Sequence, residues 1–225
     1  MAATEEALTV GLFGGTFDPV HQGHIDLARH VLARCRLDRL LFIPAPLPPH
    51  KRQPVAPFTH RVAMINAALA DCPDTSGRVS CSRIEEHLAT PSYTINTVQA
   101  LQREAGHDRY ALIIGADSLL DLPHWHQIDE LLSLVSLIVV KRDGIDEAAI
   151  DRSLSSLGPH YVYDHVQHRW LGQNNKTADY LGDIELPVSS SAIREDLAHG
   201  RIPVMLPPVV LHYIIQHRLY GWRST

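Results

Sequence analysis

Cysteine is scarce in this chain. Three of its 225 residues are cysteines, at positions 35, 72 and 81, and no two of them form a C-x-x-C pair. An odd number of scattered thiols fits neither a disulfide framework nor a zinc ribbon. Unpaired thiols are typical of proteins from a reducing compartment, so we expect a cytoplasmic protein.

The chain also lacks a long hydrophobic run and an excess of positive charge. Its most apolar run, LLSLVSLIVV at 131–140, is about half the length that crosses a bilayer. The acidic start, MAATEEALTV, does not have the basic and then apolar layout of a signal peptide. The formal net charge of −5 argues against a broad nucleic-acid-binding surface. We therefore predict small-molecule partners, with no nucleic acid and no membrane, and we leave a homo-oligomer open.

Apolar runs rich in β-formers alternate with helical patterns along much of the chain. This alternation predicts right-handed βαβ units, and hence an α/β fold with a doubly wound, mostly parallel Rossmann-like sheet and helices on both faces. In such a sheet, ligands bind at the carboxyl ends of the strands, near the point where the strand order reverses. The expected strands are 9–13, 39–44, 78–84, 110–115 and 136–142, and the expected helices are 25–35, 59–72 with Thr59 as N-cap, 93–104, 191–200 and 208–221.

The domain organisation follows from length and hydrophobic content. With 45% hydrophobic residues and no clear linker, we expect one domain over 1–225. Its core would cover about 8–144, and a small helical part about 189–221. The intervening 145–180 is polar and rich in histidine with little periodicity, so we expect loop or peripheral structure there.

The segment GLFGGTFDPVHQGH at 11–24 lacks the usual signatures of a phosphate site. It is a glycine-rich turn after an apolar strand, yet no G-K-[ST] follows and the spacing is not G-x-G-x-x-G. It ends on His21 and His24, in the first turn of the expected helix, where free backbone N–H groups and the positive end of the helix dipole point. An imidazole there donates a hydrogen bond to a phosphoryl oxygen without adding a permanent charge.

Two alternatives stay open for this histidine pair. Among 15 histidines some lie at the surface, and an H-x-x-H pair also suits zinc. A zinc site needs a third ligand, however, and no cysteine or carboxylate motif of metal spacing accompanies the pair. Phosphate handling is therefore the favoured interpretation.

Two further segments follow expected strands. FIPAPLPPHK at 42–51 contains four prolines, which stiffen a loop that delivers Lys51 over the sheet edge. The alternative is a solvated lysine on a proline-rich surface loop. In IIGADSLLDLPHWH, Gly115 ends a strand, Asp117 in the following turn suits a ribose diol, and Trp125 suits stacking on a planar ring. The alternatives are an N-cap aspartate and a core tryptophan.

The segment VSSSAIRED at 188–196 combines three hydroxyls with Arg194 one helical turn later. Hydroxyls, backbone amides and a guanidinium at the start of a helix make a second anion site. The alternative is a helix N-cap, and we expect one of the serines to cap.

Taken together, these motifs resemble a known family. GGTFDPVHQGH, PPHK, PSYT, GADS with a later Trp, and SSSAIR occur in this order in bacterial nicotinate mononucleotide adenylyltransferases, members of the H-x-G-H nucleotidyltransferase superfamily. The resemblance runs from about 8 to 221 and weakens over 145–180. It implies transfer of AMP from ATP to nicotinate mononucleotide, giving deamido-NAD and pyrophosphate in NAD biosynthesis, with Mg²⁺ carried by ATP and no protein ligands to the metal.

Two alternatives to this activity remain: an adenylyltransferase acting on nicotinamide mononucleotide or another phosphorylated acceptor, and a catalytically idle nucleotide-binding protein.

The resemblance also implies roles for particular residues. The implied catalytic residues are His21, His24 and Lys51; the implied ATP-binding residues are Gly14, Gly15, Thr16, Phe17, His24, Gly115, Asp117, Ser189, Ser190 and Arg194; and the implied mononucleotide-binding residues are Gly15, Thr16, Lys51, Thr94, Trp125 and His126.

Overall fold

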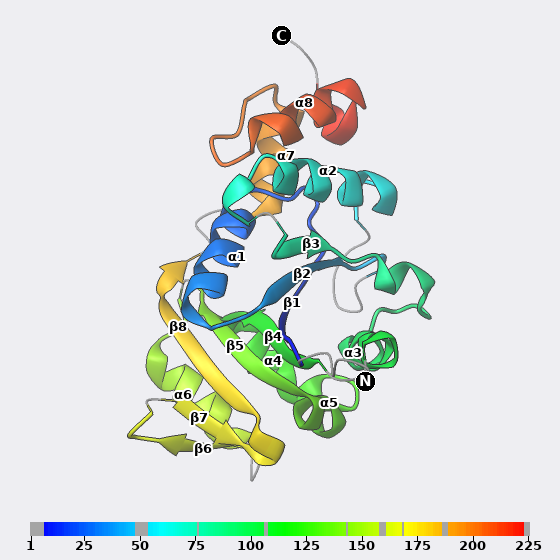
Figure 1. The fold of residues 1–225 in the computed structure, drawn as a ribbon. Coiled ribbons are helices and arrows are strands. Elements are labelled where there is room, and N and C mark those ends of the chain that lie inside the picture. Colours follow the sequence, from blue (N-terminus) through cyan, green and yellow to red (C-terminus); the bar gives the residue numbers. More distant parts are fainter. Residues whose placement is uncertain are drawn as a thin grey trace.

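A twisted sheet with helices on both faces organises the structure, a computed structural model of the chain (Figure 1). The structure describes residues 7–47, 54–75, 77–105, 108–142, 144–157, 161–167, 169–185 and 189–222. No helix in these ranges is long and apolar enough to cross a membrane.

Within the described residues the strands form an eight-stranded sheet of order β3-β2-β1-β4-β5-β8-β7-β6. The six strands from β3 to β8 along this order are parallel, and β7 and β6 continue the sheet in antiparallel fashion. The strand order reverses between β1 and β4. From β1 the sheet extends one way through β2 and β3, and the other way through β4 and β5. The strands are β1 Thr9–Gly15, β2 Arg39–Pro44, β3 Val79–Cys81, β4 Arg109–Gly115, β5 Val135–Lys141, β6 Tyr161–Asp164, β7 Arg169–Gly172 and β8 Thr177–Glu185.

The helices bury the two faces of the sheet in two hydrophobic clusters. Neighbouring residues of β1 show why: Phe13 packs in the cluster with α1, α2, α7 and α8, and Leu12 in the cluster with α3, α4, α5 and α6. Side chains of a strand alternate between faces, so a continuous apolar run serves both clusters. The helices are α1 Gln22–Arg34, α2 Phe58–Ala70, α3 Thr94–Glu104, α4 Ala116–Asp121, α5 Ile128–Leu134, α6 Glu147–Ser156, α7 Ser190–Ala198 and α8 Pro208–Gln216, with 3-10 turns that include η2 Ile84–His87 and η6 Leu219–Gly221.

The parallel core confirms the fold class expected from the sequence, and all five expected strands are present. The Thr59 N-cap is wrong. Helix α2 begins at Phe58 with Pro57 as its N-cap, because the carbonyl of Pro57 accepts hydrogen bonds from the backbone N–H groups of His60 (3.1 Å) and Arg61 (3.2 Å). Helix α1 likewise begins earlier than expected, at Gln22.

The expectation of loop or peripheral structure over 145–180 is wrong in part: β6 and β7 do lie at the edge of the sheet, but the described residues form regular elements and not a loop. This region contributes α6, β6, β7 and the start of β8, and β8 pairs in parallel with the central strand β5, with Ala178 opposite Leu137. One face of the hairpin of β6 and β7 is solvated, so that even the apolar Val162 is 69% exposed there. Buried Trp170 and Ala178 supply the inner face.

The C-terminal helix is shorter than the expected 208–221. Helix α8 ends at Gln216, and Arg218 and Tyr220 have left-handed backbone conformations, with φ of 53° and 58°. This turn brings the Tyr220 side chain into the interior, where it is 8% exposed. Figure 1 shows α8 lying beyond α2, on the side of the sheet that α1 covers.

Candidate active site

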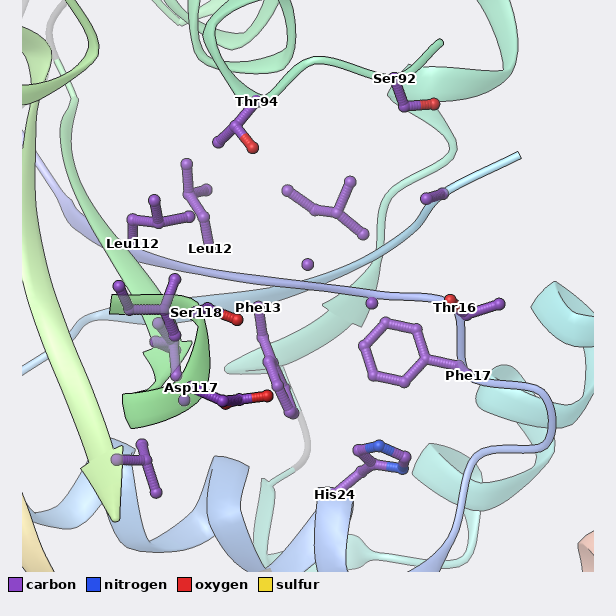
Figure 2. A pocket seen from close by; sticks show the side chains of 18 of the residues that line it. Leu12, Phe13, Thr16, Phe17, His24, Ser92, Thr94, Leu112, Asp117 and Ser118 are labelled. Carbon is purple, nitrogen blue, oxygen red and sulfur yellow. The ribbon is translucent and has the colours of Figure 1, made fainter. Parts of the chain in front are cut away.

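A cavity of about 750 Å³ opens at the carboxyl ends of β1, β4 and β5. This is the point where the strand order reverses, as the doubly wound topology predicts for a ligand site. Figure 2 shows His24 and Asp117 on one side of the cavity, with Thr94 and Ser92 on the opposite side. The cavity thus has two walls, one built from the β1–α1 loop with the ends of β4 and β5, and one from η2 and the start of α3.

The glycine-rich loop presents bare backbone to the cavity. A Cβ atom built on Gly14 would meet no other atom within 4 Å, so the space over this residue is open. Gly15 is crowded instead, because a Cβ there would lie 2.8 Å from the ring of Phe17. Phe17 itself has a left-handed conformation (φ 48°) and packs edge-on against Phe13, with ring centroids 5.3 Å apart. Together with Thr16, these residues line the cavity as expected.

The two predicted histidines lie together at the start of α1. His21 is the N-cap, and the His21 and His24 rings stack with centroids 3.6 Å apart. The backbone N–H of His21 donates to Nδ1 of His24 at 3.2 Å. A neutral ring whose Nδ1 accepts must carry its proton on Nε2, so His24 has a hydrogen-bond donor at Nε2. Both rings line the cavity.

His21 is neutral near pH 7. Only 1% of the residue is exposed, and burial, aided by the positive charge of Arg142, lowers its pKa to about 4. Its Nδ1 atom is buried and has no hydrogen-bond partner among the described residues. Burial therefore keeps this imidazole uncharged.

Asp18, which sequence reasoning did not select, anchors the loop between Phe17 and α1. It is 2% exposed, and its Oδ2 accepts a hydrogen bond from the backbone N–H of Val55 at 2.7 Å. Its Oδ1 accepts from the backbone N–H of Ala56 at 3.1 Å and from the Tyr220 hydroxyl at 2.7 Å. Partners 37 to 202 positions away hold this carboxylate, so no local motif could reveal the network.

Two guanidinium groups complete this network. Arg194 donates to the backbone oxygen of Asp18 at 2.6 Å and lies 3.8 Å from Oδ2 of the same residue. Arg61, 1% exposed, donates to the backbone oxygens of Thr16 at 2.6 Å and Ala56 at 3.2 Å. Burial lowers the pKa of Arg61, and the nearby Asp18 carboxylate opposes that effect, so the group remains a cation. Arg61 was also missed, since buried arginines have no sequence signature.

The serines of the SSSAIR segment divide between capping and docking. Ser189 caps α7 by accepting from the backbone N–H of Ala192 at 3.2 Å, so the expectation that one serine caps is confirmed. Ser190 donates to the backbone oxygen of Pro19 at 2.9 Å and so ties α7 to the loop. Both serines and Arg194 line the cavity.

The ends of β4 and β5 bring Gly115, Asp117 and Arg142 together. Asp117 lies in the first turn of α4, not in a turn before it, and its Oδ1 is 3.5 Å from Nε of Arg142. A Cβ on Gly115 would collide with that carboxylate in its present position, so a larger residue there would displace the Asp117 side chain. Arg142 is a third missed residue; the signal was a cation directly after an apolar strand.

The opposite wall carries hydroxyls and rings. Thr94 is the first residue of α3, and Figure 2 shows it facing into the cavity. Trp125 is half-buried in the wall, and the His126 ring lies against that of Tyr93 with centroids 4.5 Å apart. Lys51 lies outside the described residues, so its role stays a prediction.

The same wall contains a buried carboxyl group that sequence reasoning missed. Glu85 in η2 is 7% exposed, and its Oε1 accepts from the Thr97 hydroxyl at 2.7 Å. Burial raises its pKa to about 7, against the opposing hydroxyls of Thr97 and Ser92.

The donor set of the cavity fits an anionic ligand. In the ranges that the structure describes, no group of three His, Cys, Asp or Glu side chains could hold a metal ion. Hydroxyls, imidazoles, guanidinium groups and backbone N–H groups dominate the first wall instead, which suits phosphate oxygens.

The chain matches known proteins over nearly its whole length. Residues 12–196 match the cytidylyltransferase-like family. A Syntrophotalea carbinolica protein named probable nicotinate-nucleotide adenylyltransferase is 38% identical over 219 residues, which cover 95% of this chain and 97% of that protein. A Geobacter metallireducens protein of the same name is 35% identical over 220 residues, covering 95% and 98%.

Solved structures share the fold at low sequence identity. Plasmodium falciparum nicotinic acid mononucleotide adenylyltransferase complexed with NaAD superposes with a TM-score of 0.74 at 16% identity, covering 96% of this chain and 98% of that one. The same protein complexed with APC gives a TM-score of 0.70 at 15% identity. These likenesses confirm the expected nucleotidyltransferase architecture.

Proposed function

The chain belongs to the nicotinate-nucleotide adenylyltransferases of the cytidylyltransferase-like family, and from this premise we propose how its cavity performs the transfer. ATP and nicotinate mononucleotide react to deamido-NAD and pyrophosphate, a step of NAD biosynthesis. The two walls of the cavity divide the substrates between them. The first wall holds ATP, and the wall of η2 and α3 holds the mononucleotide.

The reaction needs no general base, because the attacking phosphate is already an anion. One oxygen of the mononucleotide phosphate attacks the α-phosphorus of ATP in line. A P–O bond forms there, and the bond from the α-phosphorus to the bridging oxygen breaks, so pyrophosphate leaves with that electron pair. Catalysis then rests on positioning and on stabilisation of charge as it moves onto pyrophosphate.

The observation that carries this proposal is the tautomer and position of His24. Its Nδ1 is committed to the backbone of His21, so its Nε2–H serves as a donor in a cavity wall at the start of α1. We assign that donor to an α-phosphoryl oxygen. His21, neutral and stacked on His24, holds the ring in place and offers a second donor that adds no fixed charge.

The remaining residues of the first wall would bind ATP around this centre. Gly14 offers open space over its backbone, so phosphate can approach closely there. Asp117 would accept hydrogen bonds from the ribose hydroxyls of the adenosine. Ser190 and Arg194, at the start of α7, would hold the outer phosphates, with Mg²⁺ entering on the triphosphate and offsetting its charge.

The second wall would bind the pyridine mononucleotide. Thr94 offers a hydroxyl at the N-terminus of α3, which suits the nicotinate carboxylate. Trp125 would stack on the pyridine ring, with the backbone near His126 as a further donor. Lys51 would reach the reacting phosphates from its loop.

The test is pyrophosphate release from Mg-ATP with nicotinate mononucleotide and nicotinamide mononucleotide, measured side by side. We expect a strong preference for the acid, because N–H and hydroxyl donors face its carboxylate. Equal rates with both acceptors would contradict the assignment of Thr94 and His126. Release with neither acceptor would contradict the proposed function.

A further inference from the structure

Glu85 is a buried carboxyl group in the wall of the cavity with one oxygen unaccounted for. Thr97 donates to its Oε1 at 2.7 Å, whereas its Oε2 is buried and has no hydrogen-bond partner among the residues that the structure describes. The residue is 7% exposed and yet lines the cavity, beside Ser92 and Thr94. A buried polar oxygen without a partner is costly, and such atoms in native structures call for a ligand or a function.

Among the residues that the structure describes, no charged group forms a hydrogen bond or an ion pair with Glu85. Burial is the main cause of its raised pKa, and the opposing groups are the Thr97 and Ser92 hydroxyls. On its own turn, Arg83 is engaged by Glu86 through two hydrogen bonds of 2.8 and 2.7 Å, and the third titratable neighbour is His87. The titratable groups of the facing elements, Asp121 and His126, also line the cavity.

We infer that Oε2 of Glu85 binds the mononucleotide by accepting a hydrogen bond from a ribose hydroxyl. This inference rests on the proposed function and adds a substrate-binding residue to it. A carboxylate repels the phosphate and the nicotinate carboxylate, so it must meet a donor. In nicotinate mononucleotide with its phosphate ionised, the donors are the ribose 2′- and 3′-hydroxyls, because the ring nitrogen carries no hydrogen. The nearby Thr94 hydroxyl supplies a donor for the anionic groups.

The variant Glu85→Gln tests the inference, because it keeps the shape of the side chain and replaces one oxygen by an N–H₂ donor. Hydrogen bonds to charged groups contribute enough that we expect KM for nicotinate mononucleotide to rise about tenfold or more. KM for ATP should stay within about twofold, since the other wall holds ATP. Glu86→Gln is the matched control: it removes the same charge from the adjacent residue, which pairs with Arg83 and lies outside the cavity lining.

Substrate analogues identify the partner of Oε2. For the wild-type protein, KM should rise about tenfold when one of the ribose hydroxyls is removed, in the 2′-deoxy or the 3′-deoxy mononucleotide. In Glu85→Gln that same removal should have little further effect. If Glu85→Gln raises KM by the same factor for both deoxy analogues as for the natural mononucleotide, the ribose assignment is wrong.

The pH dependence provides a readout that a purely structural role would not move. Because the ionised carboxylate is the stronger acceptor, the ratio of KM in Glu85→Gln to KM in the wild type should grow as pH rises through about 7. Using a ratio removes the titration of the substrate phosphate. For the wild type alone, the KM ratio of the deoxy to the natural mononucleotide should grow over the same range, so the test stands even if the variant folds poorly.

The outcomes separate this inference from the proposed function. Wild-type protein that releases no pyrophosphate with nicotinate mononucleotide overturns the proposed function and the inference with it. An active wild type with unchanged KM in Glu85→Gln overturns the inference alone. If Glu85→Gln raised KM for nicotinamide mononucleotide alone, the inference would be wrong as well, because Oε2 would then bind the amide and not the ribose.

Discussion

The two walls of the cavity are built in opposite ways. The wall of the β1–α1 loop is held by hydrogen bonds to Asp18, Arg61 and Arg194 from distant parts of the chain. The wall of η2 and α3 instead keeps a buried carboxyl oxygen without a partner among the described residues. A preorganised wall suits charge stabilisation, which gains from donors that need not move. A wall with an unmet acceptor suits recognition of a neutral group on the substrate. Variants of the first wall should therefore affect kcat or stability, and variants of the second should affect KM for the acceptor.

The largest expected effect is that of His24→Ala on the first wall. Removing one donor to the transferring phosphoryl group should lower kcat by about 10² or more. His30→Ala on the same helix is the control, because His30 pairs with Asp183 on the outside of the helix and is absent from the cavity lining. Steady-state pyrophosphate release measures both, and near wild-type kcat in His24→Ala would remove His24 from the reaction centre.

Asp18→Asn should mainly reduce stability. Two backbone N–H groups and the Tyr220 hydroxyl would lose a charged acceptor, and Arg194 would lose a counter-charge, so we expect a loss of about 2 kcal/mol in the free energy of unfolding. Urea denaturation measures this loss. Asp26→Asn, at a half-buried position on α1 with 46% of its side chain accessible, should change stability by at most about 0.5 kcal/mol. Equal stabilities of the two variants would refute the anchoring role.

Trp125→Ala tests the second wall. Loss of ring stacking should raise KM for nicotinate mononucleotide about tenfold while leaving KM for ATP within about twofold. Each substrate is titrated with the other saturating, so the variant serves as its own control. A dominant effect on KM for ATP would place Trp125 with the nucleotide and would break the division between the walls.

The smallest expected effect comes from the remote end of the Asp18 network. Tyr220→Phe keeps the ring and removes the hydroxyl that donates to Oδ1 of Asp18 at 2.7 Å, so we expect a loss of about 1 kcal/mol in stability and a kcat lowered a few-fold. Tyr213→Phe removes a similar hydroxyl, which lies 2.9 Å from Nδ1 of His60. Neither residue lines the cavity, so this variant should leave kcat unchanged. Equal kcat values for the two variants would show that the first wall does not depend on Tyr220.

Much of the fold and part of the site could be predicted from the sequence. The buried strands could be predicted because each is an apolar run in the sequence. The two histidines lie at the start of α1, where the motif predicts them. Strand β8 could not be predicted, because its sequence TADYLGDIE is not a continuous apolar run and is interrupted by Asp179 and Asp183. Arg142 could have been found from its place after an apolar strand, whereas Glu85 could not, since nothing near it in sequence shows that it is buried.

By itself, the sequence determined the alternation of strands and helices, the point of strand reversal as the place for a ligand, and the order of motifs that marks the family. Such features are encoded locally, through periodicity and turn residues. Only the tertiary structure decided that Tyr220 meets Asp18 across 202 positions, that His21 is neutral, and that Glu85 has an oxygen with no partner among the described residues. The physical reason is burial: pairing and desolvation depend on which distant segments pack together, and those segments share no local pattern.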